Sequence, residues 1–184
     1  RVLALDFDPQ ASLTTFFGIR PELEFSDSGT VYDALRYEGK VPLSSVIQKT
    51  YFHNLDMVPA GLLLSEYETE TANALARRVQ PIFAERLALA LDEVGADYDL
   101  VLIDCPPSLS MLTLNGLSCA HGVIVPMQCD YFALEGLTDL VNTIRQVRAN
   151  MNKDLAVIGL LRVMFDPRIT LQQQVSDQLK AHFA

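Results

Sequence analysis

Residues 98–107 read YDLVLIDCPP, and this stretch indicates the fold more strongly than any other. Four apolar residues run directly into Asp104, and two prolines then stop the extended pattern. A continuous apolar run of this kind is typical of a strand buried on both faces of a parallel sheet. Residues 1–10, RVLALDFDPQ, repeat the pattern, with Asp6 and Asp8 at the end of the run and a proline behind them. We therefore expect two buried parallel strands that carry aspartates to one shared edge of a sheet.

Strand and helix patterns alternate along the chain. Apolar, strand-like runs occupy residues 1–5, 55–60, 100–104, 122–127 and 155–164. Helical spacing is found at 62–80, 82–95, 134–151 and 170–183, and shorter helices are expected near 14–17 and 30–37. Gly95 is a C-cap candidate, Thr170 an N-cap candidate, and residues 18–29 have the composition of a surface loop. The alternation predicts an α/β fold, a doubly wound and mostly parallel sheet with helices on both faces, in a single domain over residues 1–184.

The composition narrows the class of protein. No apolar run approaches the roughly 18–20 residues of a membrane span, and no signal peptide is evident, so we expect a cytoplasmic protein. The three cysteines form no C-x-x-C pair and are expected to be buried, reduced thiols, and the three histidines show no metal-binding spacing. A formal charge of −9 argues against a strong, autonomous nucleic-acid binder, although a local basic patch is compatible with it.

The strand-end aspartates suggest metal and phosphate chemistry. An acid at the tip of a buried strand, as at Asp104, is the Walker B arrangement and can hold Mg²⁺ directly or through water. Asp6 and Asp8 lie two residues apart, so an extended backbone points both to one side, where they repel unless a cation or water lies between them. One acid would face metal-bound water and the other would orient an attacking water. A structural alternative stays open, in which Asp104 is a turn residue and Asp8 or Ser12 caps a helix.

Five ordered segments, which run nearly from end to end, resemble the ParA/Soj/MinD family of deviant-Walker P-loop ATPases, and partition ParA proteins most. They are RVLALDFDPQASLTTFFG (1–18), TVYDAL with LDMVPA (30–35 and 55–60), YDLVLIDCPPSLSMLTLNGL (98–117), VPMQCDYFALEGL (125–137) and MFDPRITLQQQVSDQL (164–179). The resemblance implies an ATPase for chromosome or plasmid partition with ATP and Mg²⁺ as cofactors. It also implies ATP-dependent homodimerisation, nonspecific DNA binding at the nucleoid, and hydrolysis stimulated by a ParB-type partner.

The resemblance also implies roles for individual residues. Asp8 matches the acid that positions the hydrolytic water, and Asp6 and Asp104 match the acids around Mg²⁺ and its water shell. The matching switch residues, which sense the γ-phosphate, are Gln10, Pro106, Pro107 and Ser108. Asp166, next to Phe165, matches a position near the adenine. The family often has glycine and asparagine where Ala11 and Ser12 stand here.

One family motif does not occur in these residues. The KGGVGKT-type phosphate loop has no match, and no G-x-x-x-x-G-K-[ST] sequence is found. The backbone N–H groups and lysine of such a loop supply most of the grip on phosphate. We therefore expect these residues to be part of a larger protein, with the first strand, the phosphate loop and the C-terminal end outside them. We also expect this polypeptide alone to bind ATP poorly.

Two other function classes stay open at this point. A MinD-like positioning ATPase would need a C-terminal amphipathic helix that binds the membrane surface. A noncatalytic interaction module would keep the fold and the dimer surface without turnover, but the intact aspartates argue against that degeneration. For DNA binding, Arg145 and Arg148 share a predicted helix face, and further basic candidates are Lys153, Arg162 and Arg168.

Overall fold

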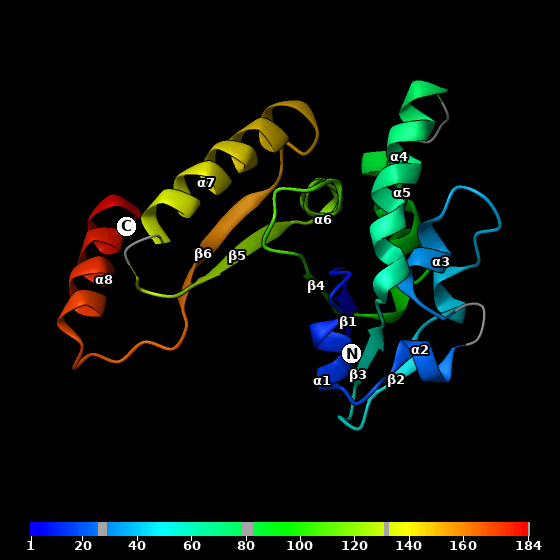
Figure 1. Ribbon diagram of the computed structural model, residues 1–184, viewed down its shortest axis with the longest axis horizontal. Helices are drawn as coiled ribbons and strands as arrows, with labels where there is room; N and C mark the ends of the chain where they lie inside the picture. Colours follow the sequence, from blue (N-terminus) through cyan, green and yellow to red (C-terminus); the bar gives the residue numbers. More distant parts are fainter. Residues whose placement is uncertain (26–28, 79–82, 131–132, 184) are drawn as a thin grey trace. The chain divides into compact units, whose positions relative to one another are not determined.

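The computed structural model of the protein describes residues 1–25, 29–78, 83–130 and 133–183 (Figure 1). These residues have the predicted α/β fold with mostly parallel strands. They form two compact units, Arg1–Cys119 and Ala120–Ala184. The assignment of one domain to residues 1–184 stays a prediction.

The first unit contains a four-stranded sheet with helices. Its elements in chain order are β1 (Val2–Asp6), α1 (Ser12–Phe16), α2 (Pro21–Glu24), α3 (Val31–Leu35), η1 (Leu43–Ser45), β2 (Gln48–Lys49), β3 (Leu55–Val58), η2 (Leu62–Ser65), α4 (Glu66–Ala76), α5 (Phe83–Asp92), η3 (Gly95–Asp97), β4 (Leu100–Asp104) and α6 (Met111–Cys119). The strand order is β2-β3-β1-β4, in which β3, β1 and β4 are parallel and the short edge strand β2 is antiparallel.

The second unit is built on a parallel pair of strands. Its elements are β5 (Gly122–Met127), α7 (Ala133–Asn150), β6 (Ala156–Arg162) and α8 (Thr170–Phe183). Buried side chains of β5, α7 and α8, among them Val125, Leu137 and Val175, form its own hydrophobic cluster. The helical spacing seen in the sequence therefore buries one stripe of each helix in this unit.

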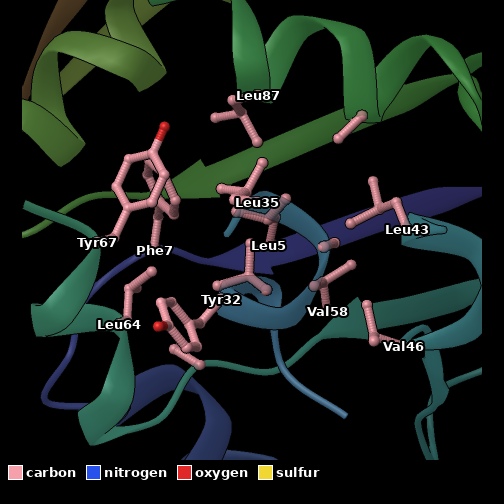
Figure 2. Packing of buried hydrophobic residues seen from close by; sticks show 14 of the residues in the cluster. Leu5, Phe7, Tyr32, Leu35, Leu43, Val46, Val58, Leu64, Tyr67 and Leu87 are labelled. Carbon is pink, nitrogen blue, oxygen red and sulfur yellow. The ribbon is translucent and has the colours of Figure 1, made fainter. Parts of the chain in front are cut away.

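The main core lies in the first unit and depends on alternation along β1. The odd-numbered residues Leu3, Leu5 and Phe7 are fully buried in one cluster with side chains of α3, α4 and α5 (Figure 2). Because successive side chains of a strand point to opposite faces, Asp6 belongs to the other face, and Asp8 follows in the turn after the strand. The hydrophobic side of β1 thus anchors the strand in the core. The acidic side chains lie at the end of the strand and in the turn after it.

Several element boundaries differ from those expected from the sequence. Residues 62–65 form a 3-10 turn before α4, and β2 and α2 were not predicted. The helix expected to end at Gly95 ends at Asp92, and Gly95 instead opens η3. Thr170 is the first helical residue of α8 and not its N-cap. Short elements such as β2 carry too few residues for a periodic pattern, so tertiary pairing decides them.

A buried carboxylate joins the strands at the end of the sheet opposite to Asp104. Asp56 on β3 is 3% exposed and accepts hydrogen bonds from Lys49 Nζ at 2.8 and 2.9 Å, from Arg1 Nη2 at 2.7 Å and from the Tyr98 hydroxyl at 2.8 Å. Burial alone would raise the pKa of Asp56, but these three donors together lower it. One side chain therefore links β1, β2, β3 and the segment before β4.

Replacing Asp56 with Asn should lower the free energy of unfolding at pH 7 by about 2 kcal/mol, because charge-assisted hydrogen bonds are lost. Lys49 is largely exposed, so solvent screens part of the attraction and a larger effect is not expected. Since the folded pKa of Asp56 is lowered, its contribution is present above the unfolded pKa and fades as the pH falls below about 4. Urea unfolding at pH 7 and pH 3 measures this, with Asp92→Asn as an exposed control. An equal difference at both pH values would contradict it.

Candidate functional site

The two strands that end in aspartate lie side by side. β1 and β4 pair in parallel, and Asp6 is the register partner of Asp104. The pairing continues one residue further, since the Phe7 N–H donates to the Asp104 carbonyl oxygen at 2.8 Å. Both carboxylates therefore emerge from the same edge of the sheet, the edge where ligands bind in parallel α/β sheets. Asp8 lies two residues after Asp6 and is the third acid of the site.

Asp6 is the most enclosed of the three acids. It is fully buried, and its Oδ2 atom accepts hydrogen bonds from the N–H and the hydroxyl of Thr14 at 2.8 and 2.7 Å. Its Oδ1 atom accepts a longer hydrogen bond, 3.2 Å, from the Asp8 N–H. The Asp6 carboxylate thus ties the start of the 8–13 segment to the helix α1 that follows it.

Asp8 sits in a tight turn and is only partly buried. Its Oδ1 atom accepts the Gln10 N–H at 2.9 Å, and its carbonyl oxygen accepts the Ala11 N–H at 2.9 Å. Ala11, the residue before α1, has φ 53° and ψ 37°, which is the left-handed region. That conformation costs a non-glycine residue about 1–2 kcal/mol, which glycine at this position would avoid.

Asp104 carries the electrostatic signature of the site. The residue is exposed, but partial desolvation of its carboxylate is the first cause that raises its pKa, and the negative charges of Asp6 and Asp8 raise it further. A cation placed near these carboxylates would relieve the repulsion that raises this pKa. Among the residues that the structure describes, no three or more His, Cys, Asp or Glu side chains are grouped to hold a metal ion by themselves. The residues fit Mg²⁺ only if water and phosphate oxygens complete its coordination, as is usual for this ion.

The loop after β4 is held by side chains that the sequence did not single out. The Thr113 hydroxyl on α6 donates to the carbonyl oxygen of Ser108 at 2.6 Å. The carbonyl oxygen of Pro106 lies 3.3 Å from the same hydroxyl. Glu68 on α4 accepts the Met111 N–H at 3.2 Å, which satisfies a donor at the start of α6. The loop that contains Pro106, Pro107 and Ser108 is therefore held by α6, and the start of α6 is held in turn by α4.

Close packing holds α6 against the residue after Asp104. A Cβ atom built on Gly116 would lie 2.7 Å from the Cys105 sulfur, so only glycine fits there without a shift. Burial raises the pKa of the Cys105 thiol to about 12 and that of Cys119 to about 11. All three cysteines are unpaired, and these two thiols are protonated at neutral pH. They are therefore packing groups and not nucleophiles.

Asp166 belongs to the second unit, where it lies in the loop between β6 and α8. Its carboxylate pairs with the Arg168 guanidinium at 2.7 Å, and this partner lowers the pKa of Asp166. Its N–H donates to Gln172 Oε1 at 2.7 Å. The position near the adenine stays a prediction for Asp166.

The described part of the chain contains no helix long and apolar enough to cross a membrane. Of the basic residues considered for DNA binding, Arg168 is paired with Asp166, and Arg162 donates to Ser176 Oγ at 2.5 Å. Arg145 and Arg148 are exposed on α7. Lys153, Arg162 and Arg168 are exposed as well, so burial excludes none of these basic residues.

The chain is similar to known proteins over its whole length. Residues 1–157 match the family model described as an AAA domain. The chain is 44% identical to an uncharacterized protein of Pseudomonas putida and 40% identical to the sporulation initiation inhibitor protein Soj of Bacillus subtilis. Both matches cover the whole chain, which spans 65% of the length of the first relative and 68% of the second.

Solved structures are similar over the whole chain or nearly so. Cobyrinic acid a,c-diamide synthase from Mycobacterium smegmatis with a bound ATP analog and magnesium has a TM-score of 0.87 and 34% identity, and the match covers 100% of this chain and 68% of that one. A plasmid partition protein from Borrelia burgdorferi has a TM-score of 0.76 and 28% identity, over 97% of this chain and 72% of that one. The cobyrinic acid a,c-diamide synthase structure thus holds an ATP analog and magnesium on a similar fold.

Proposed function

Because this chain belongs to the ParA/Soj family of partition ATPases, we propose that the complete protein hydrolyses ATP with Mg²⁺ to drive chromosome or plasmid partition. The observation that carries this proposal is the pairing of Asp6 with Asp104, which brings two strand-end carboxylates and Asp8 to one edge of the sheet. The raised pKa of Asp104 supports it, since such a group of acids is stabilised by a bound cation.

Each site residue has a proposed part in hydrolysis. Asp8, partly buried and next to the sheet edge, holds and orients the attacking water. Asp104 would face Mg²⁺ through the ion's water shell, beside its register partner Asp6. When bound, Mg²⁺ neutralises the charge that develops on the phosphates. Gln10 and the Pro106, Pro107 and Ser108 segment lie on the loops that follow these two strands, where the γ-phosphate would be sensed.

The proposal extends to partners. ATP binding would bring two copies together, and the dimer would bind DNA nonspecifically at the nucleoid in the cytoplasm, with a ParB-type partner stimulating hydrolysis. The net charge of −9 requires a local basic surface for DNA, and Arg145 and Arg148 on α7 are exposed candidates for part of it. Adenine contact by Asp166 belongs to the same proposal.

The test uses the complete protein, purified without nucleotide. We expect ATP hydrolysis that stops when EDTA removes Mg²⁺, and a change from monomer to dimer by light scattering when ATP is added. We also expect the ATP form to bind duplex DNA of unrelated sequence, with an affinity that falls as salt rises. Failure to bind ATP at millimolar concentration in the presence of Mg²⁺ would overturn the proposal.

A further inference from the structure

We propose that Thr14 is a positioning residue for ATP hydrolysis, acting through Asp6 to fix Asp8, and this inference rests on the proposed function. Thr14, at the third position of α1, is fully buried, as is Asp6. Neither residue faces solvent, so their contact is an internal joint between β1 and α1. Sequence analysis assigned Asp6 to the metal's surroundings and gave Thr14 no role.

The hydroxyl of Thr14 connects three segments of the chain. It donates to Asp6 Oδ2 at 2.7 Å and accepts the Ala60 N–H at 2.9 Å. The Thr14 N–H donates to the same Asp6 oxygen at 2.8 Å. A hydroxyl has one proton to give and two lone pairs to accept with, so this side chain meets both demands at once. Thr14 therefore joins the ends of β1 and β3 to helix α1.

The contact between Thr14 and Asp6 determines the position of the Asp8 backbone. The second oxygen of Asp6 accepts the Asp8 N–H at 3.2 Å, so one carboxylate holds both ends of the 8–13 segment. The turn between them places the Asp8 side chain, which accepts the Gln10 N–H. If the Asp6 carboxylate rotates, the support of the Asp8 backbone moves with it. A displacement of about 1 Å at a group that orients a reacting water can cost about 10²-fold in rate.

The burial of Asp6 distinguishes its positioning role from direct coordination of a metal ion. Both of its oxygens already accept hydrogen bonds from Thr14 and Asp8, and the residue has no exposed surface. A metal-facing carboxylate at the same edge is instead Asp104, which is exposed. Asp6 therefore orients the 8–13 segment, and Thr14 holds Asp6 in place.

The test compares steady-state ATPase kinetics of Thr14→Val and Thr14→Ser in the complete protein. Valine keeps the shape and removes the hydroxyl, so kcat should fall about tenfold or more while KM for ATP changes less than about threefold. Serine keeps the hydroxyl and should retain at least about half of the kcat. The control is Thr71→Val, an equally buried threonine on α4 whose hydroxyl contacts Tyr37 and not the 8–13 segment. A Thr14→Val protein with kcat within twofold of wild type would overturn the proposal.

Asp6→Asn tests the joint from its other side, and it decides the matter if Thr14→Val does not fold. An amide keeps one oxygen and cannot accept all three hydrogen bonds, so kcat should fall while the Mg²⁺ concentration for half-maximal rate stays within about threefold. A large increase in the Mg²⁺ requirement would instead make Asp6 a metal-facing residue and contradict the inference. A further check combines Thr14→Val with Asp8→Ala, where the valine should lower the residual rate no further.

Hydrogen exchange keeps this inference separate from the proposed function. In Thr14→Val the Ala60 amide should exchange about tenfold faster or more than in wild type, because its acceptor is gone. This holds even if the complete wild-type protein hydrolyses no ATP, a result that would refute the function and leave the joint standing. Unchanged exchange at Ala60 would show that the joint does not form.

Discussion

Replacing Asp8 with Ala in the complete protein should lower kcat for ATP hydrolysis by about 10²-fold or more and leave ATP affinity within about threefold. Asp8 stands beside the paired strand ends of Asp6 and Asp104, and its carboxylate is the partly exposed acid in the turn after β1. A group that positions the attacking water and accepts its proton contributes about 10²–10⁴-fold to a rate. The variant should therefore bind ATP, dimerise and stay in the ATP state.

Stopped hydrolysis must be separated from lost binding in that experiment. Isothermal titration with ATP and Mg²⁺ gives the affinity, and phosphate release gives kcat for the same preparation. Asp92→Ala, an exposed carboxylate at the end of α5, serves as the control and should turn over at the wild-type rate. Unchanged turnover in Asp8→Ala would remove Asp8 from its assigned role, and a matched loss of ATP affinity would assign it to binding instead.

Replacing Phe7 with Ala should lower the free energy of unfolding by about 3–5 kcal/mol, the range for truncating a buried aromatic ring. Phe7 stands between the two aspartates in the sequence, yet its ring is fully buried in the main core with Leu5 and Tyr67 (Figure 2). The loss combines the burial of the ring with the cavity that it leaves. Domains of this kind are stable by only about 5–15 kcal/mol, so the effect is large.

Urea unfolding followed by circular dichroism measures the difference, and Phe16→Ala is the matched control. Phe16 lies on α1 in the same unit and is 69% exposed, so its truncation should cost less than about 1 kcal/mol. Equal losses for the two variants would mean that Phe7 does not support the core. Because Phe7 anchors the strand end, we also expect a lower kcat in Phe7→Ala at temperatures where it is folded.

The fold and the main acids could be predicted because they follow from repetition along the chain. The apolar runs at 1–5 and 100–104 are long enough to identify as parallel strands, and the aspartates after them fall at the carboxyl edge by the geometry of such sheets. The alternation of side chains along the strand likewise separates Asp6 from Leu5 and Phe7. These features are local, so a single sequence contains them.

Other features depend on contacts between distant residues and could not be predicted. Gly95 was expected to end a helix, but the helix ends at Asp92, and Gly95, which has no positive φ, opens a 3-10 turn. Asp56 accepts hydrogen bonds from residues up to 55 positions away from it, and no local pattern marks them. The role of Glu68 at the start of α6 depends in the same way on two helices meeting.

The sequence by itself determines the strands and the aspartates at their ends. Both the pattern of apolar residues in a strand and the proline that follows it are signals that span only a few residues. The packing of the chain alone decides that Asp6 opposes Asp104 in register and that Thr14, eight residues after Asp6 and 46 before Ala60, holds both. Threonine has no sequence signature for such a role, because its hydroxyl bonds to whatever donor or acceptor the folded chain brings within about 3 Å. The sequence therefore shows which side chains can take part in the reaction. The positions of these side chains relative to one another are set by long-range hydrogen bonds that form on folding.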